Sequence, residues 1–340
     1  MAMPVPTPSQ PEAPLLRVRD LSVCFHSNGE TVHAVNGVSF DLQRGSAVGI
    51  VGESGCGKST VALALMQLLT RSAEISGGSV SLSGRELLSL NANEMRHVRG
   101  RDIALVFQDP MTALNPVLTI GQHLRETLSL HEGLSGKAAH ARSVELLKLV
   151  GIAAPESRLA AYPHQLSGGM RQRVMIALAV SGKPKLLIAD EPTTALDVTI
   201  QAQILQLLSR LRDELDMSII LVSHDLGVVA NLADRVLVMY GGAVVEDGTA
   251  EQVLLEPKHP YTKALIAARP EIDSDRGTAL CAIPGAAGRL TEQPSSCSFE
   301  PRCAVRMEVC SARLPKLAWD GAHGAACWHV AGASGEGQVP

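Results

Sequence analysis

The residues that most directly indicate a chemistry lie between positions 52 and 59. There the chain reads Gly-Glu-Ser-Gly-Cys-Gly-Lys-Ser, which matches the phosphate-binding pattern G-x-x-x-x-G-K-[ST]. The glycines let backbone N–H groups turn toward phosphate oxygens, while Lys58 reaches the terminal phosphates and Ser59 can ligate Mg²⁺. We therefore expect a nucleotide to bind through Gly52, Glu53, Ser54, Gly55, Cys56, Gly57, Lys58, Ser59 and Thr60.

A pair of carboxylates follows a second apolar run. Residues 186–189 read Leu-Leu-Ile-Ala and are followed by Asp190 and Glu191. Taken alone, two carboxylates at the end of a strand are as often part of a solvated turn as of a functional site. Beside a phosphate loop, Asp190 can hold Mg²⁺ and Glu191 can orient or deprotonate a water molecule. Together the two motifs indicate a nucleotide-hydrolysis site.

A parallel sheet is needed to position both groups. Residues 47–51 are a continuous apolar run directly before the phosphate loop, and a helical pattern over 60–69 follows. This order of strand, loop and helix is the context that the motif requires. Further strands are expected at 103–107, 186–189, 218–222, 235–240 and 243–246, and further helices at 87–98 and 200–213.

Three segments lie outside this alternation. Strand-like runs within 16–42, broken by turn residues, predict an antiparallel sheet. From 109 to 180 the pattern is helical, over 120–130, 138–150 and 170–180, which indicates a helical insertion. Beyond about residue 255 the chain is rich in Pro, Gly, Ala and Cys, which predicts a separate, loop-rich C-terminal region.

Composition excludes several classes of protein. With 340 residues, 46% of them apolar, the chain is long enough for one large domain and an appendage, and is not globally disordered. The longest apolar run, 174–180, is far shorter than the roughly 20 residues of a membrane-spanning helix. Residues 1–14 contain five prolines and no Lys or Arg, so we expect a flexible tail and a cytosolic chain. A net charge of −4 and 3% aromatic residues argue against nucleic acid as a partner.

A third motif resembles a known family. Residues 166–173, Leu-Ser-Gly-Gly-Met-Arg-Gln-Arg, are similar to the signature sequence of ATP-binding cassette ATPases, and they precede the acidic strand as in that family. The family also has a lone Gln after a strand, a SALD-like loop and a switch histidine, which are matched here by Gln108, by 194–197 and by His224.

The resemblance implies a role for each matched residue. Gln108 would touch Mg²⁺ or the attacking water, and His224 would contact the γ-phosphate, so the catalytic set is Glu191, His224, Gln108 and Lys58. The Mg²⁺ ligands would come from Ser59, Gln108 and Asp190. Phe25 lies where the family stacks an aromatic ring on adenine, although a core phenylalanine would fit the same pattern.

The family also implies dimers. Ser167, Gly168 and Gly169 would begin a helix whose positive N-terminus suits the γ-phosphate held by a second subunit. In a head-to-tail dimer, two chains then form two sites, and Asp197 lies in the loop between the motifs.

Two further segments indicate a branch of the family. Residues 107–116 resemble the Q-loop region of oligopeptide, dipeptide and nickel importer ATPases, and 259–265 with 283–285 resemble their C-terminal extension. The implied fold is α/β: a P-loop NTPase (RecA-like) core with an antiparallel β subdomain, a helical insertion and a cysteine-containing, loop-rich extension. The implied organisation is a tail over 1–14, an ATPase domain over 15–254 with its helical subdomain at about 109–180, and the extension over 255–340.

This branch implies partners. They are two transmembrane permeases, a second homologous ATPase and an extracytoplasmic binding protein, with this chain on the cytoplasmic face of the inner membrane. Peptides, nickel chelates or a glutathione-like cargo all remain open. Two other functions compete with transport: a non-transport cassette ATPase that acts on ribosomes or DNA, and a redox or iron sensor in which the ATPase is subordinate.

The cysteines concentrate in the extension. Cys297, Cys303, Cys310 and Cys327 are separated by five, six and sixteen residues. Four thiolates suit a zinc ion or an iron–sulfur cluster, and buried thiols of no further role are the third possibility. Some members of the branch carry a 4Fe-4S cluster on this pattern, so the expected cofactors are ATP, Mg²⁺ and a 4Fe-4S cluster. Cys56, in the phosphate loop, is expected to be either a reactive thiol or, more simply, a small packing residue.

Overall fold

A computed structural model describes residues 13–27, 29–194, 196–268, 283–285, 288 and 290–331. Its centre is an eight-stranded sheet in the order β11-β12-β10-β9-β3-β8-β7-β6, with parallel pairing from β9 through β6. The strands are β3 (Ala47–Val51), β6 (Ile103–Val106), β7 (Leu186–Asp190), β8 (Ser218–Ser223), β9 (Arg235–Tyr240), β10 (Ala243–Thr249), β11 (Ala318–Asp320) and β12 (His323–Ala325). The predicted parallel core is confirmed, because β3 is the central strand that ends at the phosphate loop.

The central strands are buried on both faces. Every residue of β3, β7 and β8 is buried. Leu187 packs into one apolar cluster with the helices, whereas Ile188 packs into a second cluster with the antiparallel sheet. Successive strand residues point to opposite faces, so both faces must be covered, and the strands therefore read as continuous apolar runs.

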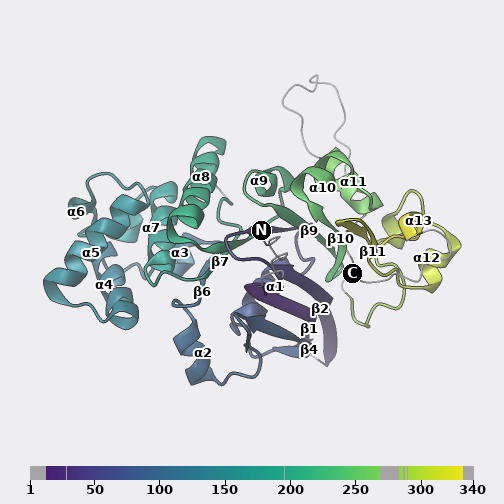
Figure 1. The fold of residues 1–340 in the computed structure, drawn as a ribbon, viewed down its shortest axis with the longest axis horizontal. Coiled ribbons are helices and arrows are strands. Elements are labelled where there is room, and N and C mark those ends of the chain that lie inside the picture. The colour runs from purple at the N-terminus through teal and green to yellow at the C-terminus, as the bar shows by residue number, and fades with distance from the viewer. Residues whose placement is uncertain are drawn as a thin grey trace, which may run out of the picture.

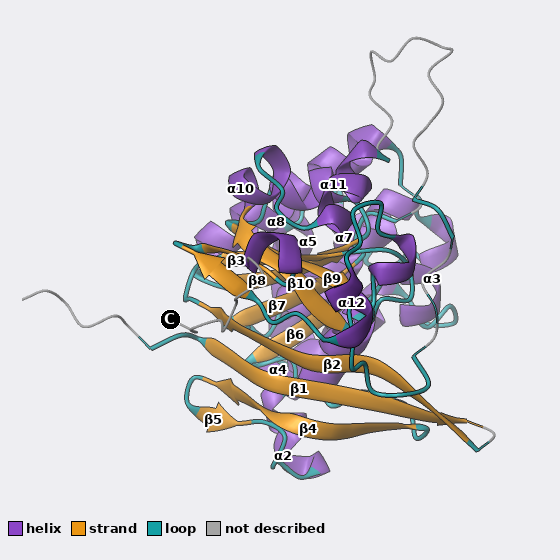
Figure 2. Cartoon of the chain, turned by 90° about the vertical axis from the view of Figure 1, so that its right-hand side faces the viewer, coloured by secondary structure: helices purple, strands orange, loops and turns teal. Residues whose placement is uncertain are grey.

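A second, antiparallel sheet covers one face of the first. Its order is β2-β1-β4-β5, formed by β1 (Leu16–Ser27), β2 (Glu30–Leu42), β4 (Ala73–Leu82) and β5 (Arg85–Glu86). The predicted β1–β2 pairing is confirmed, with Leu16 opposite Leu42. Figure 2 shows this sheet as a separate layer below the main one, with helices on the far side. These helices include α8 (Val198–Leu215), α10 (Ala250–Leu255) and α11 (Pro260–Ala267), whereas α1 (Lys58–Leu65) belongs to the phosphate loop and α9 (Leu226–Ala230) follows β8.

The helical insertion is also confirmed. It contains α3 (Pro110–Ala113), α4 (Ile120–Glu132), α5 (Gly136–Leu149), α6 (Pro155–Arg158), a 3₁₀ turn (Pro163–Gln165) and α7 (Gly168–Val180). In Figure 1 the helices α4, α5 and α6 form the left end of the molecule, while α12 (Glu308–Ala312) and α13 (Trp328–Ala331) lie at the opposite end. The strands and the loop that carry the nucleotide motifs lie between these two ends.

One predicted helix is shorter than expected. The pattern over 87–98 predicted a single helix, but α2 spans only Ala92–Val98. Asn91 accepts bonds from the amides of the first turn, and Glu94 bonds back to the Asn91 N–H, forming a capping box. Leu87 is fully buried without being helical, because it packs against the core from a loop.

The C-terminal region is less separate than its composition suggested. Strand β12 pairs antiparallel with β10, so the extension completes the main sheet. Glu246 of β10 is fully buried and accepts hydrogen bonds from the backbone N–H groups of Lys258 and His259 and from the ring of His323. The division at residue 254 remains a prediction, but the two parts share one sheet.

Candidate nucleotide site and related structures

The phosphate loop has the backbone that its glycines permit. Gly57 has φ +101°, and a Cβ there would lie 2.3 Å from the carbonyl oxygen of Ala34. The Lys58 side chain is buried, and its ammonium donates to the carbonyl oxygens of Gly52 at 2.8 Å and Glu53 at 2.9 Å. The loop is therefore curled around the lysine, which is the conformation needed to bring its N–H groups to one side.

An open cavity of about 460 Å³ lies beside this loop. Its wall combines the loop, the start of α1 and the ends of three strands: Ala34, Ser54, Gly55, Gly57, Lys58, Ser59, Thr60, Gln108, Glu191 and His224. The structure thus brings together residues of four motifs that are up to 170 positions apart in the sequence, from Ser54 to His224, beside Ala34 of β2.

Asp190 lies next to Ser59, as expected of two ligands of one cation. The Ser59 hydroxyl donates to Asp190 Oδ1 at 2.9 Å. Burial raises the pKa of Asp190, and the Ser59 hydrogen bond opposes that shift only in part. A carboxylate that is short of solvation gains most from a cation, so the donor set suits Mg²⁺.

Residues of three sequence motifs meet at Glu191. Its Oε2 accepts hydrogen bonds from Gln108 Nε2 and Thr194 Oγ1, both at 2.9 Å, and His224 Nδ1 lies 3.4 Å away. Glu191 also has φ +45°, a left-handed backbone conformation that is uncommon for this residue type and clusters at functional sites. The contacts fix the carboxylate at the cavity wall.

The signature segment lies elsewhere on the surface. Ser167 caps α7 by accepting from the Met170 N–H at 3.3 Å, which confirms the predicted helix start, and it is solvent-exposed. Asp197 caps α8 in the same way and is exposed as well. Neither lies among the described residues that line the cavity.

Two other sequence candidates have packing surroundings. Phe25 is half-buried on β1, between Val32 and Ala73 of the neighbouring strands, and is not one of the described cavity-lining residues. Cys56 is 2% exposed, and burial raises the pKa of its thiol. These surroundings favour the packing alternative for Cys56, whereas adenine stacking by Phe25 stays a prediction.

Sequence reasoning missed the contacts that the extension makes with the phosphate loop. Tyr261 accepts a hydrogen bond from the Glu53 N–H at 2.8 Å, and Arg302 forms a two-pronged ion pair with the Glu53 carboxylate. The motif at 259–265 was visible in the sequence, but no spacing rule connects it or Arg302 with residue 53.

The four tail cysteines gather around one small cavity. They line it together with Phe299, Val305 and Trp328, among others. All four are free thiols. Burial and the neighbouring cysteines raise the pKa of Cys297 to about 11, and those of Cys303 and Cys327 are also raised. Across the described ranges, no group of three or more His, Cys, Asp or Glu residues is arranged to hold a metal ion.

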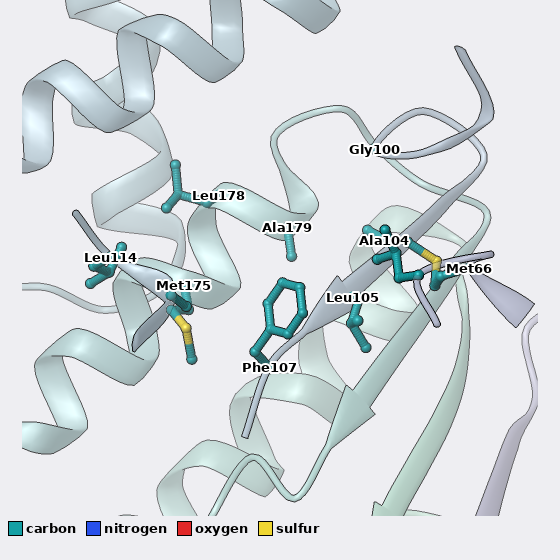
Figure 3. A pocket seen from close by; sticks show the side chains of 11 residues that line it. Met66, Gly100, Ala104, Leu105, Phe107, Leu114, Met175, Leu178 and Ala179 are labelled. Atoms are coloured by element: carbon teal, nitrogen blue, oxygen red, sulfur yellow. The ribbon is translucent and has the colours of Figure 1, made fainter. Parts of the chain in front are cut away.

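An apolar pocket of about 250 Å³ lies where the insertion meets the core sheet. In Figure 3 the Phe107 ring stands between Leu105 on β6 and Met175 and Ala179 on α7. Phe107 is 45% exposed, and the next residue, Gln108, reaches the nucleotide cavity.

None of the described helices is long and apolar enough to span a membrane.

Comparison with family models matches residues 35–194 to the ABC transporter family and residues 245–310 to the oligopeptide/dipeptide transporter C-terminal region.

Curated relatives match over nearly the full length. A putative peptide import ATP-binding protein of Brucella abortus is 49% identical over 93% of this chain and 95% of its own. The oligopeptide and dipeptide transport ATP-binding proteins OppD and DppD of Bacillus subtilis are each 49% identical, over 87% and 92% of this chain and 83% and 94% of their own.

Solved structures agree with the fold. An ATP-binding cassette determined as a dimer in a post-hydrolysis state with ADP and Pi superposes with a TM-score of 0.62 at 29% identity, covering 69% of this chain and 98% of that one. A subunit of the ABC transporter complex cbiONQ from Clostridium perfringens superposes with a TM-score of 0.61 at 29% identity, covering 72% and 92%. The chain therefore belongs to the ABC transporter family of ATP-binding subunits, in the branch that carries the oligopeptide/dipeptide transporter C-terminal region.

Proposed function

We propose that this chain binds MgATP in the 460 Å³ cavity and hydrolyses it to energise the import of peptides through membrane permeases. The observation that carries the proposal is the convergence of Gln108, Thr194 and His224 on Glu191, beside Lys58. The peptide cargo is supported by the relatives, which are named as peptide, oligopeptide and dipeptide import or transport proteins.

Substrate binding is assigned to the loop and its buried lysine. When phosphates enter, Lys58 exchanges its two carbonyl acceptors for phosphate oxygens, and the N–H groups of 54–59 supply further donors. Ser59 and Asp190 are the pair that would hold Mg²⁺, which when bound neutralises charge on the phosphate oxygens.

Hydrolysis is assigned to Glu191. Its carboxylate faces the cavity and accepts the proton of the attacking water, while Gln108 and Thr194 hold the carboxylate in place. His224, on the same oxygen, is placed to contact the terminal phosphate, so its position can change when that phosphate leaves.

A second ATPase subunit would complete each site. Ser167 and Gly168 are exposed at the start of α7 and are not among the described residues that line the nucleotide cavity of their own chain. The solved cassette with ADP and Pi is a dimer, which supports a pair of ATPase subunits here. Copurification from native membranes decides whether the second ATPase subunit is another copy of this chain or a homologue.

The pocket around Phe107 is proposed to receive an apolar segment of a permease. It is exposed, it lies between the insertion and the core, and it is one residue from Gln108, so occupancy can be transmitted to the nucleotide cavity. Because the described helices include none that crosses the bilayer, the chain would be held at the cytoplasmic face through this contact.

The test is copurification from native membranes in mild detergent. We expect two multi-spanning permeases, a second ATPase and ATP hydrolysis that rises when peptide and the extracytoplasmic binding protein are added. Phe107→Asp should release the permeases, whereas Leu255→Asp, at an exposed apolar residue on α10, should not. Ribosomal or DNA-bound partners in place of permeases would refute the transport proposal and support a non-transport cassette.

For the cysteine site we propose a 4Fe-4S cluster on Cys297, Cys303, Cys310 and Cys327. Four free thiols around one cavity fit the donor set, and a cluster holds its thiolates further apart than a single ion does, which is compatible with the absence of a mononuclear site among the described residues. When bound, the cluster would stabilise thiolates that burial disfavours. Iron, sulfide and visible absorption in anaerobically purified protein test this, and bound zinc or neither metal would refute it.

A further inference from the structure

Glu53 places a negative charge in the loop proposed to hold phosphates. It is the second residue of the loop, and its side chain is about one quarter exposed. Among the described residues that line the nucleotide cavity Glu53 is absent, although Ser54 and Gly55 are present. Its carboxylate faces the C-terminal extension instead.

Arg302 of the extension binds that carboxylate with both of its terminal nitrogens. The distances are 2.6 Å from Nη1 to Oε2 and 2.9 Å from Nη2 to Oε1. Such a fork is the strongest geometry available to a guanidinium and a carboxylate. The Arg302 side chain is only 7% exposed, so water screens the pair weakly.

The guanidinium is itself fixed by the extension and by the end of β9. Its Nε donates to the Pro284 carbonyl oxygen at 2.7 Å, and Nη1 lies 3.3 Å from the Tyr240 hydroxyl. The ring of Phe299, three residues before Arg302, packs edge-on against Tyr240 and tilted against Tyr261. Arg302 thus has little freedom to leave Glu53.

The aromatic residues beside Arg302 also hold the backbone of the phosphate loop. The Tyr261 hydroxyl accepts from the Glu53 N–H, while the Glu53 carbonyl oxygen accepts from Lys58. The extension therefore contacts the side chain of one phosphate-loop residue across 249 positions of sequence and its amide across 208.

We propose that Arg302 is a positioning residue for ATP binding: it neutralises Glu53 and holds its carboxylate away from the phosphates. Without the guanidinium, an uncompensated charge would lie one to six residues from every phosphate-binding group of the loop and would repel the triphosphate. The inference rests on the proposed phosphate role of residues 52–59.

The test is equilibrium binding of MgATP, and KM and kcat for ATP, on the full chain in its purified complex. Arg302→Met is expected to weaken ATP binding about tenfold, a typical size for coupling between neighbouring sites, with kcat nearly unchanged because the contacts of Glu191 are untouched. Adding Glu53→Gln removes the repelling charge, so the double variant is expected to recover binding to within about threefold of the wild type.

Rescue distinguishes neutralisation from a merely structural role. If Arg302 only packs the extension, the second substitution removes one more contact and binding stays weak. Arg302→Lys keeps the charge and loses the fork, so its affinity should lie between those of the wild type and Arg302→Met. This variant, together with Glu53→Gln alone, keeps the test available if Arg302→Met does not fold.

Two controls separate the possible failures. Arg306→Met, four residues further on at an exposed ion pair with Glu300, should bind ATP like the wild type. Lys58→Ala should lose ATP binding; if it does not, the proposed phosphate site is wrong. If Lys58→Ala loses binding but Arg302→Met does not, or if the double variant is no better than Arg302→Met, the inference about Arg302 is overturned.

Discussion

The substitution Glu191→Gln separates ATP binding from hydrolysis most sharply. It keeps the size of the side chain and removes its negative charge, and with it the ability to accept a proton. Gln108 and Thr194 both donate to Glu191 Oε2, and an amide oxygen can accept the same two hydrogen bonds. The change in folding stability should therefore stay within about 1 kcal/mol.

The kinetic effect should be much larger. A positioned general base contributes roughly 10²–10⁴ in rate, so kcat should fall by that factor, or about 3–5 kcal/mol of transition-state stabilisation. The affinity for MgATP should stay within about twofold, because Lys58, Ser59 and Asp190 keep all their contacts with one another and with the loop. The variant should accumulate ATP-bound protein.

The assay pairs this variant with Asp190→Asn, its neighbour on the same strand end. Single-turnover phosphate release and ATP binding are measured for both. Asp190→Asn should weaken Mg²⁺-dependent binding, whereas Glu191→Gln should not. Hydrolysis by Glu191→Gln at more than about one tenth of the wild-type rate would refute the assignment of the base. Loss of ATP binding would show that Glu191 acts mainly in the loop structure.

Three further predictions concern stability and the loop. Burial lowers the pKa of His259 to about 4, below its value of about 6.5 in the unfolded chain. As the pH drops from about 6.5 to about 4, the unfolded chain therefore takes up a proton that the folded chain does not, and the free energy of unfolding should fall by about 3 kcal/mol. His259→Asn, which can still cap α11, should remove this part of the pH dependence of urea unfolding. Asp247→Asn leaves Arg235 without its buried partner, at 2.6 Å in the structure, and should cost about 3 kcal/mol in thermal or urea unfolding. Gly57→Ala should reduce ATP binding far more than Gly55→Ala, since both have positive φ but only Gly57 has a backbone atom in the way; equal losses would contradict the steric argument.

The parts of the structure that could be predicted are those decided by local pattern. The run at 47–51, the loop and the start of α1 lie together in sequence, so their geometry follows from their own residues. The members of the Glu191 group were named from motifs, but their contacts were not predicted, because Gln108 and His224 reach Glu191 only through the order of strands in the sheet.

The predictions that differ from the structure involve contacts between distant segments, or a helix cap that was overlooked. The helix predicted to start at Leu87 starts instead after Asn91, which caps α2. The sequence pattern did not show this, because apolar residues keep their helical spacing on both sides of Asn91. The pairing of β12 with β10 joins segments about 80 positions apart, and the ion pair of Arg302 with Glu53 joins segments 249 apart. The composition of the C-terminal region predicts loops, because its short strands and its 3₁₀ turn (Glu300–Arg302) leave little periodic signal.

The pairing of β12 with β10 also affects how the protein avoids association. Strand β10 has seven residues and its sequence begins Ala-Val-Val, so its free edge would offer unpaired N–H and C=O groups to another chain. The extension covers that edge with β12 and then with β11, each of three residues, and the final edge carries Trp319 and the charged Asp320. Short strands with a charge at the edge are poor templates for further pairing. A chain truncated at residue 254 would therefore keep all its nucleotide motifs but expose an unpaired β edge. If that chain aggregated, the cause would be the exposed edge and not a defect of the ATPase core.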